Sequence, residues 1–263
     1  MQVRGATVLL TSATGGLGHA IARALHRRGA KLVLTGRKVA ELEALTAETG
    51  ARAIVADLAD PDDLHRLAGE AGEVDVLVAN AALPANGELL DFTAEQVRRA
   101  LAVNLDAPIA LTHALLPAML DRGRGHVVLM GSLAGKVTSA HASLYNATKF
   151  GLRGFGLALR QDLTGTGVGV SVVQPGFVRD AGMFAETGQK PPSGLRTVSP
   201  GQVAADVLDA VERDRGEVDV APVELRVAST LGSAFPGFAA ALQRRLATED
   251  VMGRMSAANR AKR

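Results

Sequence analysis

The only tyrosine in the chain, Tyr145, lies four residues before Lys149 in the segment YNATK. On a helix this spacing places both side chains on one face, where the ammonium can act on the phenol. A phenol has an unperturbed pKa near 10, and a unit charge about 4 Å away can lower it by roughly 3 units as an upper bound. We therefore expect Lys149 to lower the pKa of Tyr145 and make it an acid or base near neutral pH.

Two further polar residues lie near the expected ligand edge. Ser132 follows the predicted strand His126–Met130, and ligands of parallel sheets bind at the carboxyl ends of the strands. Asn104, in LAVNLDAP, interrupts a long helical pattern whose carbonyls a bound water can reach. The six histidines show no carboxylate partner at ligand spacing, so we expect no metal site. His141 lies between Ser132 and Tyr145, and a surface or interface imidazole is the simpler interpretation of it.

A glycine-rich segment, TSATGGLG, runs from Thr11 to Gly18 between a predicted strand and a predicted helix. Its glycines let the backbone turn sharply and approach a pyrophosphate, whose charge meets free N–H groups at the helix start. The residues expected to bind a dinucleotide here are Ser12, Thr14, Gly15, Gly16, Leu17 and Gly18.

Arg37 follows the second predicted strand, where the chain passes the adenosine ribose in a dinucleotide fold. An acidic residue there favours NAD, whereas an arginine can pair with the 2′-phosphate of NADP. NADP is therefore the expected cofactor and NAD the less favoured one, unless Arg37 is only a solvated strand end. Asp57 and Leu58 follow the third strand; Asp57 either accepts from the adenine amino group or merely begins a turn or caps a helix.

Short β-branched runs alternate with longer segments of helical apolar spacing throughout most of the chain. This alternation predicts an α/β fold, a doubly wound parallel sheet of about seven strands with helices on both faces. The predicted strands are Thr7–Leu10, Lys31–Thr35, Ala53–Val55, Val74–Val78, His126–Met130, Val168–Val173 and Val218–Val220. The predicted helices are Leu17–Arg28, Val39–Thr49, Pro61–Ala71, Ala94–Leu120, Leu144–Leu163 and Gly201–Arg213.

Composition is that of one globular domain: 263 residues, 47% of them hydrophobic, with no cysteine and a formal charge of +2. The small charge gives no reason to expect a nucleic-acid partner. Residues 1–221 form the predicted nucleotide-binding and catalytic part. It includes Ala181–Ser199, whose glycines and prolines predict a mobile flap or an ordinary surface loop. Residues 222–263 form a helical extension with a basic tail in the same domain.

From its first strand to about Ala221 the chain resembles the short-chain dehydrogenase/reductase family, in its single-domain, Rossmann-type branch. Thr11, Gly16 and Gly18 match the family's glycine loop, and Asn80 and Ala81 match its Asn-Asn-Ala-Gly segment. The resemblance implies a catalytic tetrad of Asn104, Ser132, Tyr145 and Lys149, a turn at Pro175 and Gly176 beside the nicotinamide, and a main-chain cofactor contact at Val178.

Three residues depart from the family pattern. Ser12 replaces the first glycine of the loop, which is tolerable if its φ stays negative, and Ala82 replaces the last glycine of the fourth-strand segment. Asp180 stands where a threonine often touches the cofactor. These departures concern cofactor contacts, because none touches the tetrad.

The resemblance implies an NADP(H)-dependent oxidoreductase that interconverts a secondary alcohol and a ketone or similar carbonyl by hydride transfer. Tyr145 would be the acid or base, Lys149 would also hold the nicotinamide ribose, Ser132 would donate to the substrate oxygen, and Asn104 would support a water. Apolar residues such as Leu133, Phe177 and Phe184 indicate an apolar substrate. The alternative is a catalytically silent NADP(H) sensor or interaction protein on the same fold.

The segments Ala94–Leu120 and Leu144–Leu163 are where relatives pair, which implies a homodimer or homotetramer. The start MQVRGATVLL lacks the features of a cleavable signal, so a cytoplasmic location is expected. The apolar stretch Val227–Gln243 is too short for a membrane span and contains Pro236. With basic residues Arg254, Arg260, Lys262 and Arg263 the extension either lies on a membrane surface or, as we prefer, covers a subunit interface or the substrate pocket.

Overall fold

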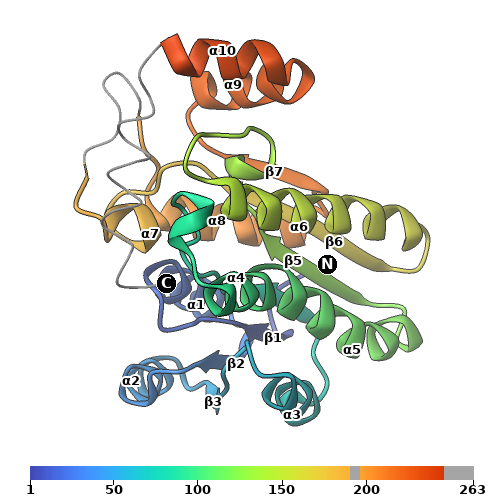
Figure 1. The fold of residues 1–263 in the computed structure, drawn as a ribbon. Helices are drawn as coiled ribbons and strands as arrows, with labels where there is room; N and C mark the ends of the chain where they lie inside the picture. The colour runs from blue at the N-terminus through green and yellow to red at the C-terminus, as the bar shows by residue number, and fades with distance from the viewer. Residues whose placement is uncertain (190–195, 246–263) are drawn as a thin grey trace.

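The computed structural model describes residues 1–189 and 196–245. Its sheet has seven parallel strands in the order β3-β2-β1-β4-β5-β6-β7, as Figure 1 shows. The predicted doubly wound parallel sheet is confirmed. The strands are β1 (Thr7–Leu10), β2 (Lys31–Gly36), β3 (Arg52–Val55), β4 (Val76–Ala79), β5 (Gly125–Met130), β6 (Val168–Pro175) and β7 (Glu217–Val220).

Helices cover both faces of the sheet because its central strands are apolar on both sides; every residue of β4 and β5 is buried. One core joins α1 (Gly16–Arg27), α2 (Val39–Thr49) and α8 (Pro200–Glu212) to the sheet. The opposite core joins α3 (Pro61–Ala71), α5 (Ala107–Asp121) and α6 (Ser143–Asp162) to it. The order reverses between β1 and β4, which places a ligand crevice at the carboxyl ends of these strands.

The long helix expected over Ala94–Leu120 is divided. It consists of α4 (Ala94–Leu101), a π-helical turn at Ala102–Asp106, and α5. The run from Ala94 to Asp121 is long and apolar enough to span a bilayer by length and composition alone. Leu111, Leu115 and Met119 of α5 are nevertheless buried against the sheet, which is the packing of a core helix.

The predicted flap contains more regular structure than its composition suggested. It begins with the short helix α7 (Gly182–Ala185), whose Phe184 is buried with its ring centroid 5.0 Å from that of Phe177. Its far end returns through a parallel bridge between Val178 and Val198. Residues 190–195 lie outside the described residues, so mobility of the flap stays a prediction.

Helices α9 (Val223–Ala234) and α10 (Pro236–Arg245) form the described part of the extension, at the top of Figure 1. The extension is helical as far as Arg245, and its place in the same domain stays a prediction. Its basic tail, with Arg254, Arg260, Lys262 and Arg263, lies outside the described residues. Gly232 of α9 packs so tightly on the body that an added Cβ would lie 2.6 Å from Val137 Cγ1.

Candidate active site

Three of the four candidate tetrad residues come together at the carboxyl edge of the sheet. Tyr145 and Lys149 occupy successive turns of α6, and Ser132 follows β5 directly. The Ser132 hydroxyl forms a hydrogen bond with Tyr145, and the Lys149 Nζ lies 5.8 Å from the centroid of the Tyr145 ring. The expected grouping of a hydroxyl, a phenol and an ammonium is therefore present.

Lys149 is the largest side chain that is almost fully buried, with 2% of its surface exposed. Its Nζ donates to the Met130 carbonyl at 2.8 Å, at the end of β5. Burial disfavours the charged form and lowers the pKa of Lys149 to about 8. An ammonium that titrates close to physiological pH can hold or release a proton in a site of this kind.

The expected lowering of the Tyr145 pKa is wrong for this structure. Burial raises the pKa of the phenol, and the hydrogen bond with Ser132 only partly opposes this effect. The phenolate loses its hydration, while the Lys149 ammonium is engaged by the Met130 carbonyl. The charge of Lys149 alone therefore does not activate the phenol.

Ser132 caps a 3-10 turn at Leu133–Gly135. Its Oγ accepts from the Ala134 N–H at 3.2 Å, and its donation to the Pro175 carbonyl is long, at 3.5 Å. The backbone thus fixes the oxygen while the hydroxyl proton can be redirected. This arrangement suits a group that donates to a substrate oxygen.

Asn104 is completely buried in the π-helical turn between α4 and α5. Its Oδ1 accepts from the Leu83 N–H at 2.6 Å and its Nδ2 donates to the Leu83 carbonyl at 2.9 Å. The side chain therefore fastens the loop after β4 to the irregular helical turn. A π-helical turn displaces backbone carbonyls from the regular α-helical pattern, and such turns recur at functional sites.

The glycine-rich loop has the geometry expected of a pyrophosphate cradle. Helix α1 starts at Gly16 without a side-chain cap, which leaves first-turn N–H groups available to an anion. A Cβ on Gly18 would lie 2.2 Å from the Ser12 carbonyl oxygen, so only glycine fits there. A Cβ on Gly16 would lie 2.7 Å from the Cβ of Ala181, which brings the flap onto this loop.

The condition set for Ser12 is not met, because its φ is +51°. A left-handed conformation costs a non-glycine residue about 1 to 2 kcal/mol. The surrounding structure holds the strained Ser12 carbonyl, which accepts from the Gly15 N–H at 3.1 Å and from Asn80 Nδ2 at 3.3 Å. Thr11 completes this joint, since its Oγ1 accepts from the N–H groups of Asn80 and Ala81. The serine that replaces the family's first glycine therefore keeps a strained, left-handed backbone conformation instead of adopting a negative φ.

Arg37 and Asp57 lie together at the carboxyl ends of β2 and β3. The guanidinium of Arg37 lies 3.9 Å from Asp57 Oδ2, and that of Arg99, on α4, lies 2.7 Å from the same oxygen. Burial opposes ionisation of Asp57, but hydrogen bonds from Arg99 and the Ala59 N–H, with the charge of Arg37, outweigh it and lower the pKa. Two arginines thus surround one carboxylate, and 57% of the Arg37 side chain is exposed.

The remaining residues predicted to contact the cofactor differ in whether their side chain or only their backbone is available to it. The Thr14 side chain lies against Gly36, where an added Cβ would meet its Oγ1 at 3.0 Å. The side chain of Leu58 is buried in the core, so only its backbone is available. Gly176 follows Pro175 and donates to the Val220 carbonyl, and Val178 is buried at the base of the flap.

Asp180 and His141 both have positive φ values, +67° and +56°. Asp180 is exposed and pairs with Arg179 at 3.4 Å. His141 Nδ1 lies 3.8 Å from Glu88 Oε1, and the His141 carbonyl accepts from the Gly87 N–H at 2.6 Å. The His141 contact joins the loop before α6 to the loop after β4.

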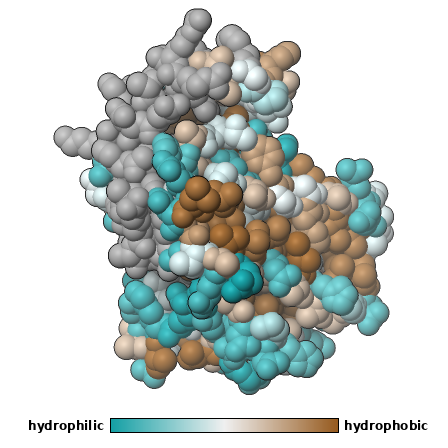
Figure 2. All heavy atoms as spheres, viewed as in Figure 1, coloured by the Kyte–Doolittle hydropathy of each residue, from teal (hydrophilic) through white to brown (hydrophobic). Residues whose placement is uncertain are grey.

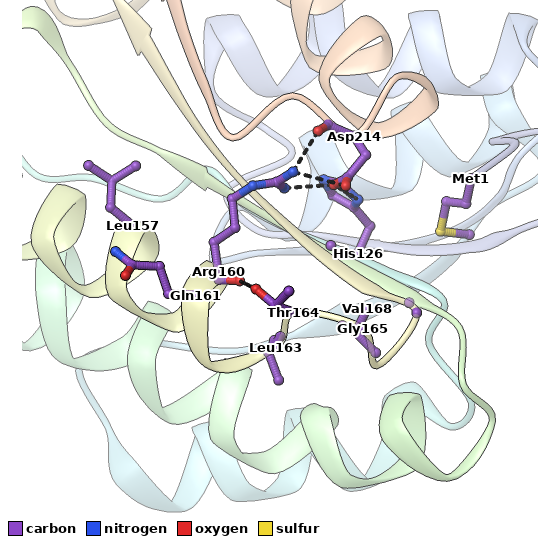
Figure 3. A pocket seen from close by; sticks show the side chains of 13 residues that line it. Met1, His126, Leu157, Arg160, Gln161, Leu163, Thr164, Gly165, Val168 and Asp214 are labelled. Carbon is purple, nitrogen blue, oxygen red and sulfur yellow. Dashed lines mark hydrogen bonds and ion pairs between the residues drawn. The ribbon is translucent and has the colours of Figure 1, made fainter.

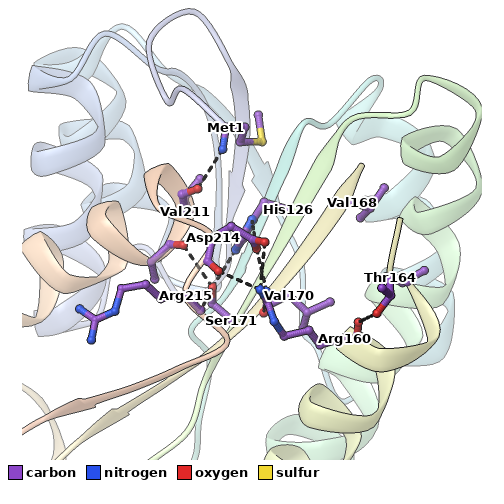
Figure 4. A network of polar contacts seen from close by, with 12 residues as sticks. Met1, His126, Arg160, Thr164, Val168, Val170, Ser171, Val211, Asp214 and Arg215 are labelled. Atoms are coloured by element: carbon purple, nitrogen blue, oxygen red, sulfur yellow. Dashed lines mark hydrogen bonds and ion pairs between the residues drawn. The ribbon is translucent and has the colours of Figure 1, made fainter. Parts of the chain in front are cut away.

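A second group of polar residues lies at the opposite, amino edge of the sheet, beside a cavity of about 490 Å³ (Figure 3). It contains His126, Ser171, Arg160 and Asp214, whose contacts Figure 4 shows. The His126 Nε2 and the Ser171 Oγ lie 2.7 Å apart, and both residues are buried.

Within residues 1–189 and 196–245, no three His, Asp or Glu side chains gather in a way that could hold a metal ion.

Sequence reasoning missed three side chains that shape the site: Arg99, Lys136 and Asn146. Asn146 lies within YNATK and donates to the Ala134 and Val137 carbonyls at 2.6 and 2.9 Å, which fixes the loop after Ser132. Lys136 is a lone cation in the apolar segment SLAGKV, a signal that was available. Arg99 gave no such signal, since it lies on an ordinary amphipathic helix.

Comparisons with known proteins agree with this geometry. A family model described as short chain dehydrogenase matches residues 6–192. Ketoacyl reductase HetN from Nostoc sp. is 39% identical over 225 residues, which are 82% of this chain and 78% of that protein. Dehydrogenase/reductase SDR family member 7B from Bos taurus is 35% identical over 257 residues, which are 89% of this chain and 79% of that protein.

A solved structure, a short-chain dehydrogenase from Sphingobium yanoikuyae in complex with NADPH, has the same fold. It is similar to this chain with a TM-score of 0.77 at 27% identity and covers 89% of this chain and 94% of its own.

Proposed function

The chain belongs to the short-chain dehydrogenase/reductase family of NAD(P)-dependent oxidoreductases, and from this premise we propose that it interconverts a secondary alcohol and a ketone with NADP(H). The observation that carries the proposal is the meeting of Ser132, Tyr145 and Lys149 at one sheet edge. Ser132 follows the carboxyl end of β5, and Tyr145 and Lys149 on α6 lie beside it, at the edge where this fold binds ligands.

The residues present fit a dinucleotide. Gly16 and Gly18 leave no room for side chains at the start of α1, and the uncapped helix offers N–H groups to a pyrophosphate. Arg37 is exposed beside the expected ribose and can pair with a 2′-phosphate. A relative of the same fold binds NADPH. When bound, the cofactor supplies or accepts the hydride.

The side chains of this protein would handle the proton and the carbonyl oxygen. Ser132, fixed as an acceptor by the Ala134 N–H, can direct its own proton to the substrate oxygen. Tyr145 would donate its proton to the same oxygen during reduction. Lys149, whose pKa is about 8, would hold the ribose and assist the proton transfer. Asn104 would support a water near the π-helical turn.

An apolar ketone is the proposed substrate class. The turn after β6 is lined by apolar groups: a Cβ on Gly176 would lie 3.3 Å from Leu133 Cδ1 and 3.8 Å from Leu225 Cδ1. The aromatic pair of Phe177 and Phe184 continues this surface into the flap. The name of one relative, a ketoacyl reductase, describes a ketone substrate.

The test is NADPH consumption against a panel of ketones, quinones and aldehydes, run in parallel with Tyr145→Phe. Turnover by the wild type with at least one carbonyl, lost in the variant, supports the proposal. NADPH binding without turnover across the panel would favour the alternative of a silent cofactor sensor.

We also propose a homodimer or homotetramer that pairs through α4, α5 and α6. Apolar side chains gather over these helices in Figure 2, and Leu101, Leu120 and Phe150 expose 37%, 39% and 38% of their surface. Light scattering of the wild type and of Phe150→Glu tests the interface, since a charge there should shift the mass toward the monomer.

Residues 222–263 are proposed to belong to the same domain as residues 1–221, because Gly232 of α9 packs on Val137 beside the active-site turn. We propose a cytoplasmic location.

We propose that the extension packs across a subunit interface or over the substrate pocket, in preference to lying on a membrane surface. Sedimentation with anionic vesicles at physiological salt decides between them, since binding would support the membrane alternative.

A further inference from the structure

An ion cluster, buried at Lys136 and partly buried at Asp219, Arg153 and Glu217, lies next to the turn that carries Ser132. The Lys136 Nζ lies 2.8 Å from Asp219 Oδ2 and 3.4 Å from Glu217 Oε2. Arg153 Nε lies 2.6 Å from Glu217 Oε1. Gln174 Nε2 donates to both acids, at 2.7 Å to Glu217 and 3.1 Å to Asp219. Only 8% of the Lys136 side chain is exposed.

The cluster joins the elements whose ends form the candidate active site. Lys136 ends the 3-10 turn that Ser132 begins. Arg153 lies on α6, one helical turn after Lys149, and Gln174 directly precedes Pro175. Both acids lie on β7, in parallel register with β6. A displacement of Lys136 would therefore reach Ser132 through a turn of only three residues.

This turn has little freedom to settle in another position. A Cβ on Gly135 would lie 2.7 Å from the Lys149 carbonyl oxygen and 3.3 Å from Gln174 Oε1. Gln174 is completely buried, and its Oε1 has no hydrogen-bond partner within the described part of the chain. The turn is thus pressed between α6 and β6, and Lys136 is the charged side chain that fastens it to β7.

The cluster is also balanced in charge, with two cations and two carboxylates. Burial opposes ionisation of Glu217, but Arg153 and Lys136 outweigh it and lower its pKa. Loss of one partner would leave an unpaired charge in a weakly screened place close to Lys149.

We propose that Lys136 is a positioning residue for the oxidoreductase reaction, which holds the Ser132 turn against β7 and balances the charges of Asp219 and Glu217. This inference rests on the proposed function, and its test has a readout that does not need turnover. The chain has one tyrosine and no tryptophan, so the ultraviolet absorbance of tyrosinate reports Tyr145 alone.

The first experiment titrates Tyr145 in the wild type, Lys136→Met, Asp219→Asn and the double variant, over the pH range in which circular dichroism shows the fold unchanged. In the wild type, Ser132 and Lys149 face the phenol. Arg153 lies two helical turns from Tyr145, about 12 Å. A charge at that distance shifts a pKa by up to about one unit.

We expect Lys136→Met to raise the pKa of Tyr145, Asp219→Asn to lower it, and the double variant to return it toward the wild-type value. A purely structural role cannot produce shifts of opposite sign. Equal shifts in both single variants would overturn the charge balance that we propose, and no shift in either variant would overturn the proposal as a whole. Where Lys136→Met does not fold, Asp219→Asn and the double variant give the same comparison.

The second experiment measures kinetics with a carbonyl that the wild type reduces. Lys136→Met should lower kcat about tenfold and leave KM for NADPH within about twofold, because Ser132 and not the cofactor site moves. Lys136→Arg should restore most of kcat. Lys31 is an exposed lysine at the start of β2, so Lys31→Met is the matched control and should resemble the wild type.

Unchanged kcat in Lys136→Met would overturn the positioning role. If the wild type reduces nothing, the proposed function fails, and the titration still decides the role of Lys136.

Discussion

Strands β5 and β6 and helix α6 carry buried polar groups at both ends, and the two ends differ in how fully those groups are paired. At the amino edge, Arg160 donates to the Val170 carbonyl, to the Asp214 carbonyl and to both Asp214 carboxylate oxygens. Ser171 donates to the Arg215 carbonyl at 2.6 Å. His126 stays neutral, because burial lowers its pKa to about 4 despite the nearby charge of Asp214.

At the carboxyl edge the same elements leave hydrogen-bonding capacity unused. The Lys149 ammonium has three donors and, within the described residues, gives one to the Met130 carbonyl. Ser132 keeps a proton whose donation to Pro175 is long. A histidine, serine and aspartate in contact thus make a structural joint at one edge. A lysine, a serine and a tyrosine at the other edge can still hydrogen-bond to a ligand. The two edges therefore differ in how many hydrogen-bond donors remain unused rather than in the types of their residues.

The largest expected effect is that of Tyr145→Phe. Loss of the hydroxyl should lower kcat at least 100-fold as general acid–base catalysis is lost, with the fold and NADPH affinity retained. Steady-state kinetics measure kcat, and fluorescence titration measures the affinity for NADPH. The matched change at the amino edge, Ser171→Ala, should cost about 1 to 3 kcal/mol of stability but leave kcat unchanged. Wild-type turnover in Tyr145→Phe would disprove the assignment.

Acid should unfold the protein through the amino edge. The pKa of His126 is about 6.5 in the unfolded chain and about 4 in the folded one, so the folded state binds fewer protons between these values. Stability is fully present above pH 6.5 and falls as pH drops to 4, by about 3 kcal/mol. Urea unfolding of the wild type and His126→Gln across this range measures the loss. Parallel curves for the two proteins would exclude His126 as the cause.

Arg37→Ala tests the cofactor end of the carboxyl edge. A charge-assisted contact is worth about 1.5 to 3 kcal/mol, so kcat/KM for NADPH should fall about 10- to 150-fold while that for NADH is nearly unchanged. The wild-type preference for NADPH should weaken in salt. Equal losses with both cofactors would make Arg37 structural, and a wild-type preference for NADH would refute the assignment of this position.

The pH dependence of kcat/KM should reveal the ionisation of Lys149 in the free enzyme. Because burial lowers the pKa of Lys149 to about 8, its charge disappears as pH rises through that value. We expect kcat/KM for reduction to decline by up to about tenfold per pH unit above it. A profile flat to pH 10 would contradict the lowered pKa.

The smallest expected effect is that of a chelator, which should leave activity unchanged because neither edge offers a cluster of metal ligands among the described residues. Dialysis against EDTA followed by assay measures it. Loss of activity that metal ions restore would contradict this expectation.

Much of the carboxyl edge could be predicted from the sequence because its signals are local. The alternation of apolar runs specified seven parallel strands, and YNATK and TSATGGLG are short segments whose meaning depends on spacing. The interruption at Asn104 was visible in the same way, as a break in helical periodicity that the structure resolves as a π-helical turn. Expected element ends differ from the observed ones by a residue or two, as at Val74–Val78 against Val76–Ala79.

The properties that were mispredicted depend on the surroundings of a residue. The direction of the Tyr145 pKa shift follows from burial, which a helical spacing of four does not reveal. The positive φ of Ser12 occurs where its carbonyl accepts from the Gly15 N–H and from Asn80 Nδ2, the latter a residue 68 positions away in the sequence.

The sequence by itself indicated the order of elements through apolar periodicity and the phosphate loop through a local glycine pattern, and its resemblance to a known family implied the candidate tetrad. Only the tertiary structure decided which charges are balanced. Lys136 and Asp219 are 83 residues apart, and Arg99 and Asp57 are 42 apart. Pairing energies depend on distance and on exclusion of water, and both are set only when the strands and helices have packed.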